Sequence, residues 1–506
     1  MGTPITLKTM KADTRDAVID TLAKTWPLNA RQVYSEVRDT QHLNITYQGV
    51  HKVLNQLVKE KIVVAQDRKY ELDAAWIKSL RKFAETADKN YSKVENVPYL
   101  EIGTGSSVEK EAFTAGREAA EKALAKIKFN KTIQLALVFT SVAYEDSFRE
   151  MIKGIQSVVG KTPLAGCSSM GGEIDNKPLS KSVVVIIFGA AKENFNAETI
   201  VFQPGEGYFK NDKLAGANGF FDFIEGKNFD CGVIFFPGFM HENKMHAGEA
   251  ARRFLEMWNI RGKKIPMIGG IAGDDWRFQK TWMFCENKVL SKEIVFIGIK
   301  TKAKFAVGME HAYEPMNDKV YLTHVDGSFV TEFSTYNSKP TPATEVYSRI
   351  SKIPIKELEK IIPAYIKESI SQNKNPPLGI ENSFLLAFPV LVSGHNMQFE
   401  IDFKEGERVR IMKTTPKQML ETSLKTMEVA IKMAEINKLY GALVFPCGVF
   451  DLILARSPRE IDYLKKKKEF HEIPLAGCYV AGEIGVRNDQ HYVRGNGAFV
   501  TLVFGE

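Results

Sequence analysis

The sequence has few cysteines and no long hydrophobic runs. Its five cysteines are scattered and none forms a CxxC pair, which argues against zinc ribbons and CxxC redox motifs. Apolar runs such as residues 183–188 have the length of a strand, whereas a membrane helix needs about 20 residues. The first residues lack the apolar segment of a signal peptide. We therefore expect reduced thiols, no membrane partner and a cytoplasmic location.

The motifs of several enzyme classes are also missing. There is no Walker A sequence, no GxGxxG that opens a helix and no GxSxG. The glycine-rich stretch 166–172 lacks the lysine that meets a nucleotide phosphate, which argues against a nucleoside triphosphatase. His241 and His246 are five residues apart instead of four, and no third ligand is evident. We expect no metal, no cofactor and no enzyme activity.

The composition predicts a folded protein of several domains. The chain has 506 residues, of which 44% are hydrophobic and 25% charged. Its net charge of +7 is mild, but residues 1–90 hold fifteen Lys and Arg against eleven Asp and Glu. This surplus of four favours a polyanionic partner for the N-terminal end.

Three short helices and a strand pair are expected in the first ninety residues. Helices are predicted over 13–24, over 30–37 and, capped by Thr46, over 46–60. The third helix places Tyr47, Val50, Leu54 and Leu57 on one stripe, which predicts their burial. Strands over 62–65 and 69–72 flank a charged turn, and a trailing helix over 76–87 leads to a linker at 89–98.

This order is typical of a winged helix-turn-helix domain, and residues 12–80 resemble archaeal-type winged-helix regulators. The polar side of the third helix and the turn carry side chains that reach bases or phosphates. The candidate DNA-binding residues are Thr46, Gln48, His51, Lys52, Asn55 and Arg68. Winged helices also bind proteins, so a scaffold role stays open.

One supersecondary unit recurs three times after residue 100. Each copy opens with an apolar strand, at 135–141, 233–238 and 443–447, and helical periodicity follows at 146–159 and 248–258. Each then reaches a related motif: PLAGCSSMGGE from Pro163, PMIGGIAGD from Pro266 and PLAGCYVAGE from Pro474. A further strand closes each copy, at 182–188, 294–299 and 498–504. Strand, helix and strand in this order indicate βαβ units.

The motifs predict a ligand site. Paired glycines turn the backbone tightly and present N–H groups, while an acid after them is suited to an amine. Open α/β sheets bind ligands where strands end, so we expect the three loops to share one edge. The candidate ligand-binding residues are Gly166, Cys167, Ser168, Ser169, Gly171, Gly172, Glu173, Gly238, Gly269, Gly270, Gly273, Asp274, Cys447, Gly477, Cys478, Gly482 and Glu483. A purely structural role for these turns is the alternative.

These motifs resemble FIST domain proteins. LVFTS, PLAGCSSMGGE, GFMHE and GGIAGDD are similar to the N-terminal half of the family. EHAYEP, TPATEV, NPPLGI, KEGERV and PLAGCYVAGEIG are similar to the C-terminal half, although Ala312 stands where the family commonly has glycine. The resemblance spans nearly all of residues 100–506. It implies an intracellular sensory module that binds a small ligand such as an amino acid, often fused to a signalling domain.

We therefore expect an α/β (α+β) multi-domain protein in which a winged helix-turn-helix domain precedes a two-part FIST module of repeated strand-helix-strand units. The domains are a DNA-binding domain at 1–92, a FIST N-terminal sensory domain at 98–315 and a FIST C-terminal domain at 316–506. The function predicted is a one-component regulator in which ligand binding biases DNA binding, with a homodimer as a further candidate assembly. Two alternatives stay open: an enzyme that uses Cys167 or Cys478 with an acid, and a scaffold.

Overall fold

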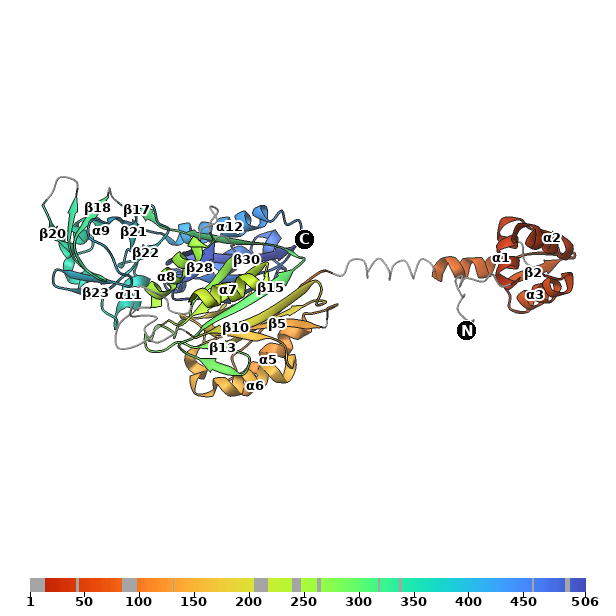
Figure 1. Ribbon diagram of the computed structural model, residues 1–506, viewed down its shortest axis with the longest axis horizontal. Coiled ribbons are helices and arrows are strands. Elements are labelled where there is room, and N and C mark those ends of the chain that lie inside the picture. Colours follow the sequence, from red (N-terminus) through yellow and green to blue (C-terminus); the bar gives the residue numbers. More distant parts are fainter. Residues whose placement is uncertain are drawn as a thin grey trace. The chain divides into compact units, whose positions relative to one another are not determined.

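The computed structural model describes residues 14–41, 45–83, 98–130, 132–203, 217–238, 247–261, 265–316, 319–335, 339–456, 459–486 and 492–506. The chain divides into two compact units, Met1–Val97 and Pro98–Glu506, which Figure 1 draws in the colours of the sequence. Each unit is described by itself. No helix among these described residues is long and apolar enough to cross a bilayer.

The first unit packs three helices on a small antiparallel sheet. The helices are α1 (Thr14–Lys24), α2 (Ala30–Gln41) and α3 (Tyr47–Lys59), and the sheet has the order β1 (Leu28–Asn29), β3 (Lys69–Leu72), β2 (Val63–Gln66). The predicted helices and the β2–β3 hairpin are confirmed; β1 was not expected because it pairs through only two residues. Residues 74–83 are helical, in the region of the expected trailing helix. The expected linker lies outside the described residues up to residue 97, and the structure describes the chain again from residue 98.

The prediction for Tyr47 is wrong. Val50, Leu54 and Leu57 are fully buried as expected, but Tyr47 is 42% exposed. It is the first residue of α3, at the end of the apolar stripe, where its ring meets the Tyr34 ring edge-on at 6.0 Å. The burial stripe of α3 is therefore one turn shorter than its periodicity suggested.

The three repeats in the second unit have the same topology. In each, the opening strand pairs in parallel with the motif strand and antiparallel with the closing strand. The strands are β5 (Ile133–Thr140), β6 (Leu164–Ser168) and β9 (Val183–Gly189) in the first repeat; β11 (Cys231–Phe236), β12 (Met267–Ile271) and β15 (Ile294–Thr301) in the second; β26 (Leu439–Pro446), β27 (Leu475–Cys478) and β30 (Ala498–Gly505) in the third. The predicted repeat is confirmed.

Helices connect the parallel strands. α6 (Phe148–Val159) and α8 (Ala247–Ile260) fill the first two crossovers, where helical periodicity was found. The third uses the shorter α13 (Gly448–Ile453) and α14 (Glu460–Lys465). All three crossovers carry the chain from an opening strand to a motif strand.

The repeats also exchange strands. After its motif, each repeat sends a short hairpin to the outer edge of another repeat's motif strand. β7 (Glu173–Asp175) pairs with β27, β28 (Glu483–Val486) with β12, and β13 (Met283–Cys285) with β6. The exchange runs from the first repeat to the third, from the third to the second and from the second to the first, so the three six-stranded sheets form a closed cycle.

The three sheets meet at an aromatic cluster. Phe139, Phe235 and Phe445, one from each opening strand, are fully buried, and their ring centroids lie 5.5–5.7 Å apart in edge-on contacts. The Sγ atoms of Cys167 and Cys478 lie beside this cluster in the same core, 4.0 Å apart. Burial of three aromatic side chains in mutual contact stabilises the point at which the repeats join.

A segment without a counterpart in the other repeats lies between the second and third. Residues 320–413 form a mainly antiparallel sheet that includes β18 (Val320–Asp326), β19 (Phe329–Thr335) and β25 (Arg408–Lys413). This insertion also carries α11 (Ile366–Ser371), and Figure 1 shows it gathered at one end of the second unit. α12 (Pro416–Met433) then returns the chain to the third sheet, where it packs on β16 (Lys304–His311) and β30.

Candidate functional site

The three motif loops lie at one edge of the sheets and hydrogen-bond to one another. The N–H of Met170 donates to the carbonyl of Tyr479 at 2.8 Å, which joins the first loop to the third. The N–H of Gly273 donates to Ser168 at 3.0 Å, and that of Ala481 donates to Ile271 at 2.9 Å. These bonds close a ring of three loops, as the repeat predicted.

A pocket opens beside this ring. Its atom-free space is about 650 Å³, a volume that includes open solvent at the mouth. All three repeats contribute to its wall, and the insertion covers the other side. The motif loops and strand ends supply Met170, Gly238, Ile271, Cys447, Val480 and Ala481; the insertion supplies Ile366, Ile370, Phe388, Val390 and Glu400.

One end of the pocket is polar and holds a buried arginine. The side chain of Arg494, at the end of β29 (Tyr492–Arg494), is 2% exposed, and its Nη2 lies 3.6 Å from Oε2 of Glu400. Oε1 of Glu400 accepts from the N–H of Phe388 at 3.0 Å and from the amide of Asn496. Burial raises the pKa of Glu400, and the charge of Arg494 opposes that rise.

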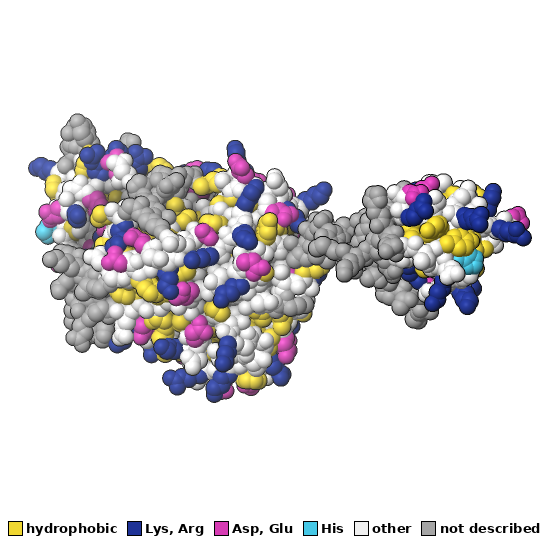
Figure 2. Space-filling model, turned by 45° about the vertical axis from the view of Figure 1, so that its right-hand side comes forward, with side chains coloured by type: hydrophobic (Ala, Val, Ile, Leu, Met, Phe, Trp, Pro, Cys, Tyr) yellow, Lys and Arg dark blue, Asp and Glu magenta, His cyan; other side chains and the backbone are white. Residues whose placement is uncertain are grey.

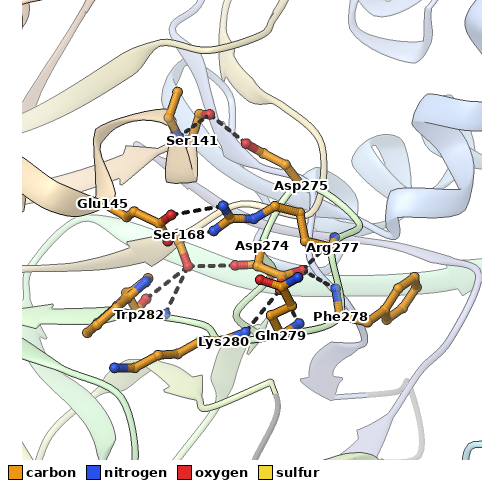
Figure 3. Close-up of polar contacts among 12 residues, drawn as sticks. Ser141, Glu145, Ser168, Asp274, Asp275, Arg277, Phe278, Gln279, Lys280 and Trp282 are labelled. Atoms are coloured by element: carbon orange, nitrogen blue, oxygen red, sulfur yellow. Dashed lines mark hydrogen bonds and ion pairs between the residues drawn. The ribbon is translucent and has the colours of Figure 1, made fainter. Parts of the chain in front are cut away.

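Two aromatic side chains line the pocket from a loop that Asp274 holds. Both carboxylate oxygens of Asp274 accept backbone N–H bonds, from Arg277 and Phe278 on one and from Gln279 and Lys280 on the other, at 2.6–3.1 Å (Figure 3). The loop between these residues presents Trp276 and Phe278 to the pocket. Asp274 therefore shapes the wall of the pocket.

A hydrogen bond and an ion pair fix the same loop from outside. Asp275 accepts from the Ser141 hydroxyl at 2.6 Å, and Arg277 makes a two-pronged contact with Glu145 at 2.6 and 2.9 Å (Figure 3). Ser168 donates to the carbonyl of Gly273 at 2.6 Å and accepts from the N–H of Trp282. The loop is thus held at both ends.

The two predicted glutamates cap strands. Glu173 is fully buried and accepts from Ser169 at 2.6 Å and from the hydroxyl and N–H of Ser182. Glu483, at the same motif position, accepts from the N–H of Ala498 at 2.9 Å, where β30 begins. Burial raises the pKa of Glu173 to about 7 and that of Glu483 to about 8.

Most of the predicted glycines allow close packing. A Cβ at Gly166, Gly269 or Gly477 would lie 1.7–1.9 Å from a carbonyl oxygen of the opening strand, so only glycine lets the paired strands approach. The others face neighbouring loops: Gly270 lies against Val480, Gly273 against Met170, Gly172 against Tyr479, Gly171 against Trp276, and Gly482 against Arg494. Of the predicted ligand residues, Gly238 and Cys447 line the pocket directly.

The pocket's polar groups were missed by sequence reasoning. Glu400 lies in the insertion, which has no repeat to single it out. Arg494 follows the third motif in the stretch YVRGNG, where an arginine beside glycines was the available signal. Trp276 directly follows the second motif, and its aromatic type was the only indication.

The candidate DNA-binding residues lie on the open side of α3 and at the hairpin turn. Thr46 caps α3 by accepting from the N–H of Gly49 at 3.1 Å. Gln48, Lys52 and Asn55 are exposed along a shallow groove that Tyr47, His51, Gln56 and Lys59 also line. Arg68 is exposed at the turn between β2 and β3. In Figure 2, several Lys and Arg side chains border a hydrophobic patch on the visible face of this unit.

His241 and His246, whose spacing was weighed against a metal site, lie outside the described residues. Within the described ranges, no three His, Cys, Asp or Glu side chains are grouped closely enough to hold a metal ion. All five cysteines are buried free thiols.

Comparison with known proteins gives a similar sequence and similar solved structures. An uncharacterized protein of Methanocaldococcus jannaschii is 24% identical over 336 residues, which cover 62% of each chain. Two solved structures of cyanuric acid hydrolases, one of them from A. caulinodans, overlap at 9% and 8% identity. The first match covers 40% of this chain and 72% of the hydrolase with a TM-score of 0.22, and the second covers 81% and 100% with a TM-score of 0.30. These scores carry no argument about fold or activity.

The family comparison is more informative. Residues 134–335 match the FIST N domain, and residues 343–486 match the FIST C domain. The first match covers the first two repeats, and the second covers most of the insertion and the third motif. The chain therefore contains a FIST N domain followed by a FIST C domain.

Proposed function

We propose that the second unit senses a small molecule, which binds in the pocket beside the three motif loops. The observation that carries this proposal is the composition of the pocket wall. It combines residues from all three repeats with residues of the insertion, so an occupant touches every part of the FIST module. A ligand that binds one state of the unit more tightly than another shifts the unit toward that state.

The first unit is proposed as the DNA-binding output, in the manner of a winged helix. α3 buries one side and leaves a polar side with Gln48, Lys52 and Asn55 exposed. Loss of a phosphate contact weakens binding to all sequences and reduces its salt dependence. Lys52→Ala is therefore expected to lower the affinity for DNA of any sequence. Lys78→Ala removes the same charge outside the groove and serves as the matched control.

Nucleophilic catalysis by a cysteine is not favoured. Cys447 lines the pocket, but burial raises the pKa of its thiol well above the usual value, and the thiol donates to Asn496 at 3.3 Å. Cys478 is buried in the core beside Cys167, and burial also raises its pKa. A thiol must ionise to attack, so both positions are poorly suited to it.

A thermal-shift screen of the full chain against amino acids, organic acids, nucleobases and sugars tests the sensor proposal. A compound at 100 times its Kd adds about 2.7 kcal/mol to stability. Fluorescence anisotropy with labelled DNA, with and without the stabilising compound, then tests the coupling. If no compound raises the Tm, the sensor proposal fails; if one does but DNA affinity never changes, the output proposal fails alone.

A further inference from the structure

Arg494 is buried in the pocket with unused hydrogen-bonding capacity. Its side chain is 2% exposed, and neither Nε nor Nη1 has a hydrogen-bond partner among the described residues. A buried, unpaired donor on a charged group costs more than an ordinary lost hydrogen bond. The pocket therefore contains a buried cation with two nitrogen atoms that lack an acceptor among the described residues.

The guanidinium of Arg494 packs closely against two glycines. A Cβ at Gly248 would lie 2.7 Å from Cζ of Arg494, and one at Gly482 would lie 3.2 Å from Nε. Gly248 is the second residue of α8, so the guanidinium rests on the first turn of a 14-residue helix. The partial positive charge of a helix N-terminus disfavours a cation and favours an anion. An anion bound beside Arg494 would therefore be attracted by both groups.

The ion pair between Glu400 and Arg494 is long. The ion pair spans 3.6 Å, longer than a good hydrogen bond, and the other oxygen of Glu400 already accepts from Phe388 and Asn496. Nε and Nη1 both lack an acceptor among the described residues, but they lie on different edges of the guanidinium plane. The fork that remains for a second acceptor is therefore Nη1 together with the second hydrogen of Nη2. Guanidinium groups pair best with carboxylates through two parallel hydrogen bonds.

The rest of the pocket is apolar. Trp276, Phe278 and Phe388 line it together with aliphatic side chains of α11. These surfaces suit a hydrocarbon or aromatic body and offer no second cation. The occupant thus needs one charged end and one apolar end.

We propose that the pocket binds a small organic carboxylate, whose carboxylate pairs with Arg494 at the first turn of α8 and whose apolar body lies against Trp276 and Phe388. This inference rests on the proposed sensor function and names its ligand class. The ligand carboxylate supplies the hydrogen-bond acceptor that Glu400 does not provide to Arg494.

Isothermal titration of the full chain with matched acids and amides tests the proposal. The probes are phenylacetate and hexanoate, each paired with its neutral amide. At least one acid is expected to bind, and at least tenfold more tightly than its amide. Arg494→Gln should lower that affinity tenfold or more, and Arg494→Lys should restore only part of it because ammonium lacks the fork geometry.

Two further variants test the proposal even if Arg494→Gln does not fold. Gly248→Ala retains every charge but pushes a methyl group onto the guanidinium, and should also weaken binding. Arg459→Gln removes a part-buried arginine that pairs with Asp451 outside the pocket lining, and should bind the acid normally.

The two levels of proposal fail differently. The ligand class is overturned if amides bind as well as acids, if Arg494→Gln and Gly248→Ala both bind normally, or if the wider screen yields only neutral or cationic ligands. If no small molecule of any class binds, the sensor function itself fails, and this inference fails with it.

Discussion

Buried carboxylates hold the loops that build the pocket. Asp274 accepts four backbone N–H bonds, while Glu173 and Glu483 each cap the start of a closing strand. These acids act on the backbone and leave recognition of the ligand to other groups.

Asp274→Asn replaces an oxygen that accepts two N–H bonds by an amide nitrogen that cannot accept any. We expect a loss of about 1–3 kcal/mol in the free energy of unfolding, measured by urea denaturation. Arg277→Gln, which breaks the half-exposed pair with Glu145, should cost less than about 1 kcal/mol. Equal losses in the two variants would contradict a special role for Asp274.

Glu483 gives the stability a defined pH dependence. Burial raises its pKa from 4.5 in the unfolded chain to about 8 in the folded protein. Between these values the folded state holds the proton and the unfolded state does not, so stability falls as the pH rises from 4.5 to about 8 and then levels off.

Glu483→Gln, which is neutral at every pH, should reduce that slope by up to about 1.4 kcal/mol per pH unit. Chemical denaturation at several pH values measures it. Exposed Glu150→Gln is the control and should leave the slope unchanged. An identical slope in wild type and Glu483→Gln would show that Glu483 ionises freely in the folded protein.

At the scale of elements, the repeated motif predicted the main topology. Recurrence of strand, helix and Pro-Leu motif located the three parallel pairs, because hydrophobic periodicity reports which strands are buried. The strand exchange could not be predicted, because strands such as β7 and β13 are only three residues long and their partners lie in other repeats. The pocket was missed in part for the same reason: Glu400 belongs to a segment that no repeat marks.

The motif glycines are expected to be sites of close strand approach. Gly166→Ala would place its Cβ 1.7 Å from the carbonyl oxygen of Val138, so the β5–β6 pair must separate. We expect a loss of about 3 kcal/mol or failure to fold. Gly219→Ala, in α7 (Ala217–Lys227) with no neighbour within 4 Å, should instead stabilise by about 0.5–1 kcal/mol. Thermal unfolding compares them, and a mild effect at Gly166 would mean that the strands are more loosely paired.

At the scale of the whole molecule, the closed cycle of sheets explains how distant residues reach one pocket. Met170, Ile366 and Arg494 come from the first repeat, the insertion and the third repeat, yet they line the same space. A ligand there joins segments more than 300 residues apart in the sequence. Its effect should therefore be visible in all of these segments at once.

Hydrogen exchange of the full chain, with and without the compound that gives the largest thermal shift, tests the central claim most directly. Residues 271–278, 366–370, 447–449 and 480–486 should all exchange more slowly in the presence of the compound, since they border the pocket or its ring of loops. The β18–β19 hairpin, remote from the lining, should be little changed. Protection confined to any other region, with these four segments unaffected, would contradict the claim that the pocket is the sensory site.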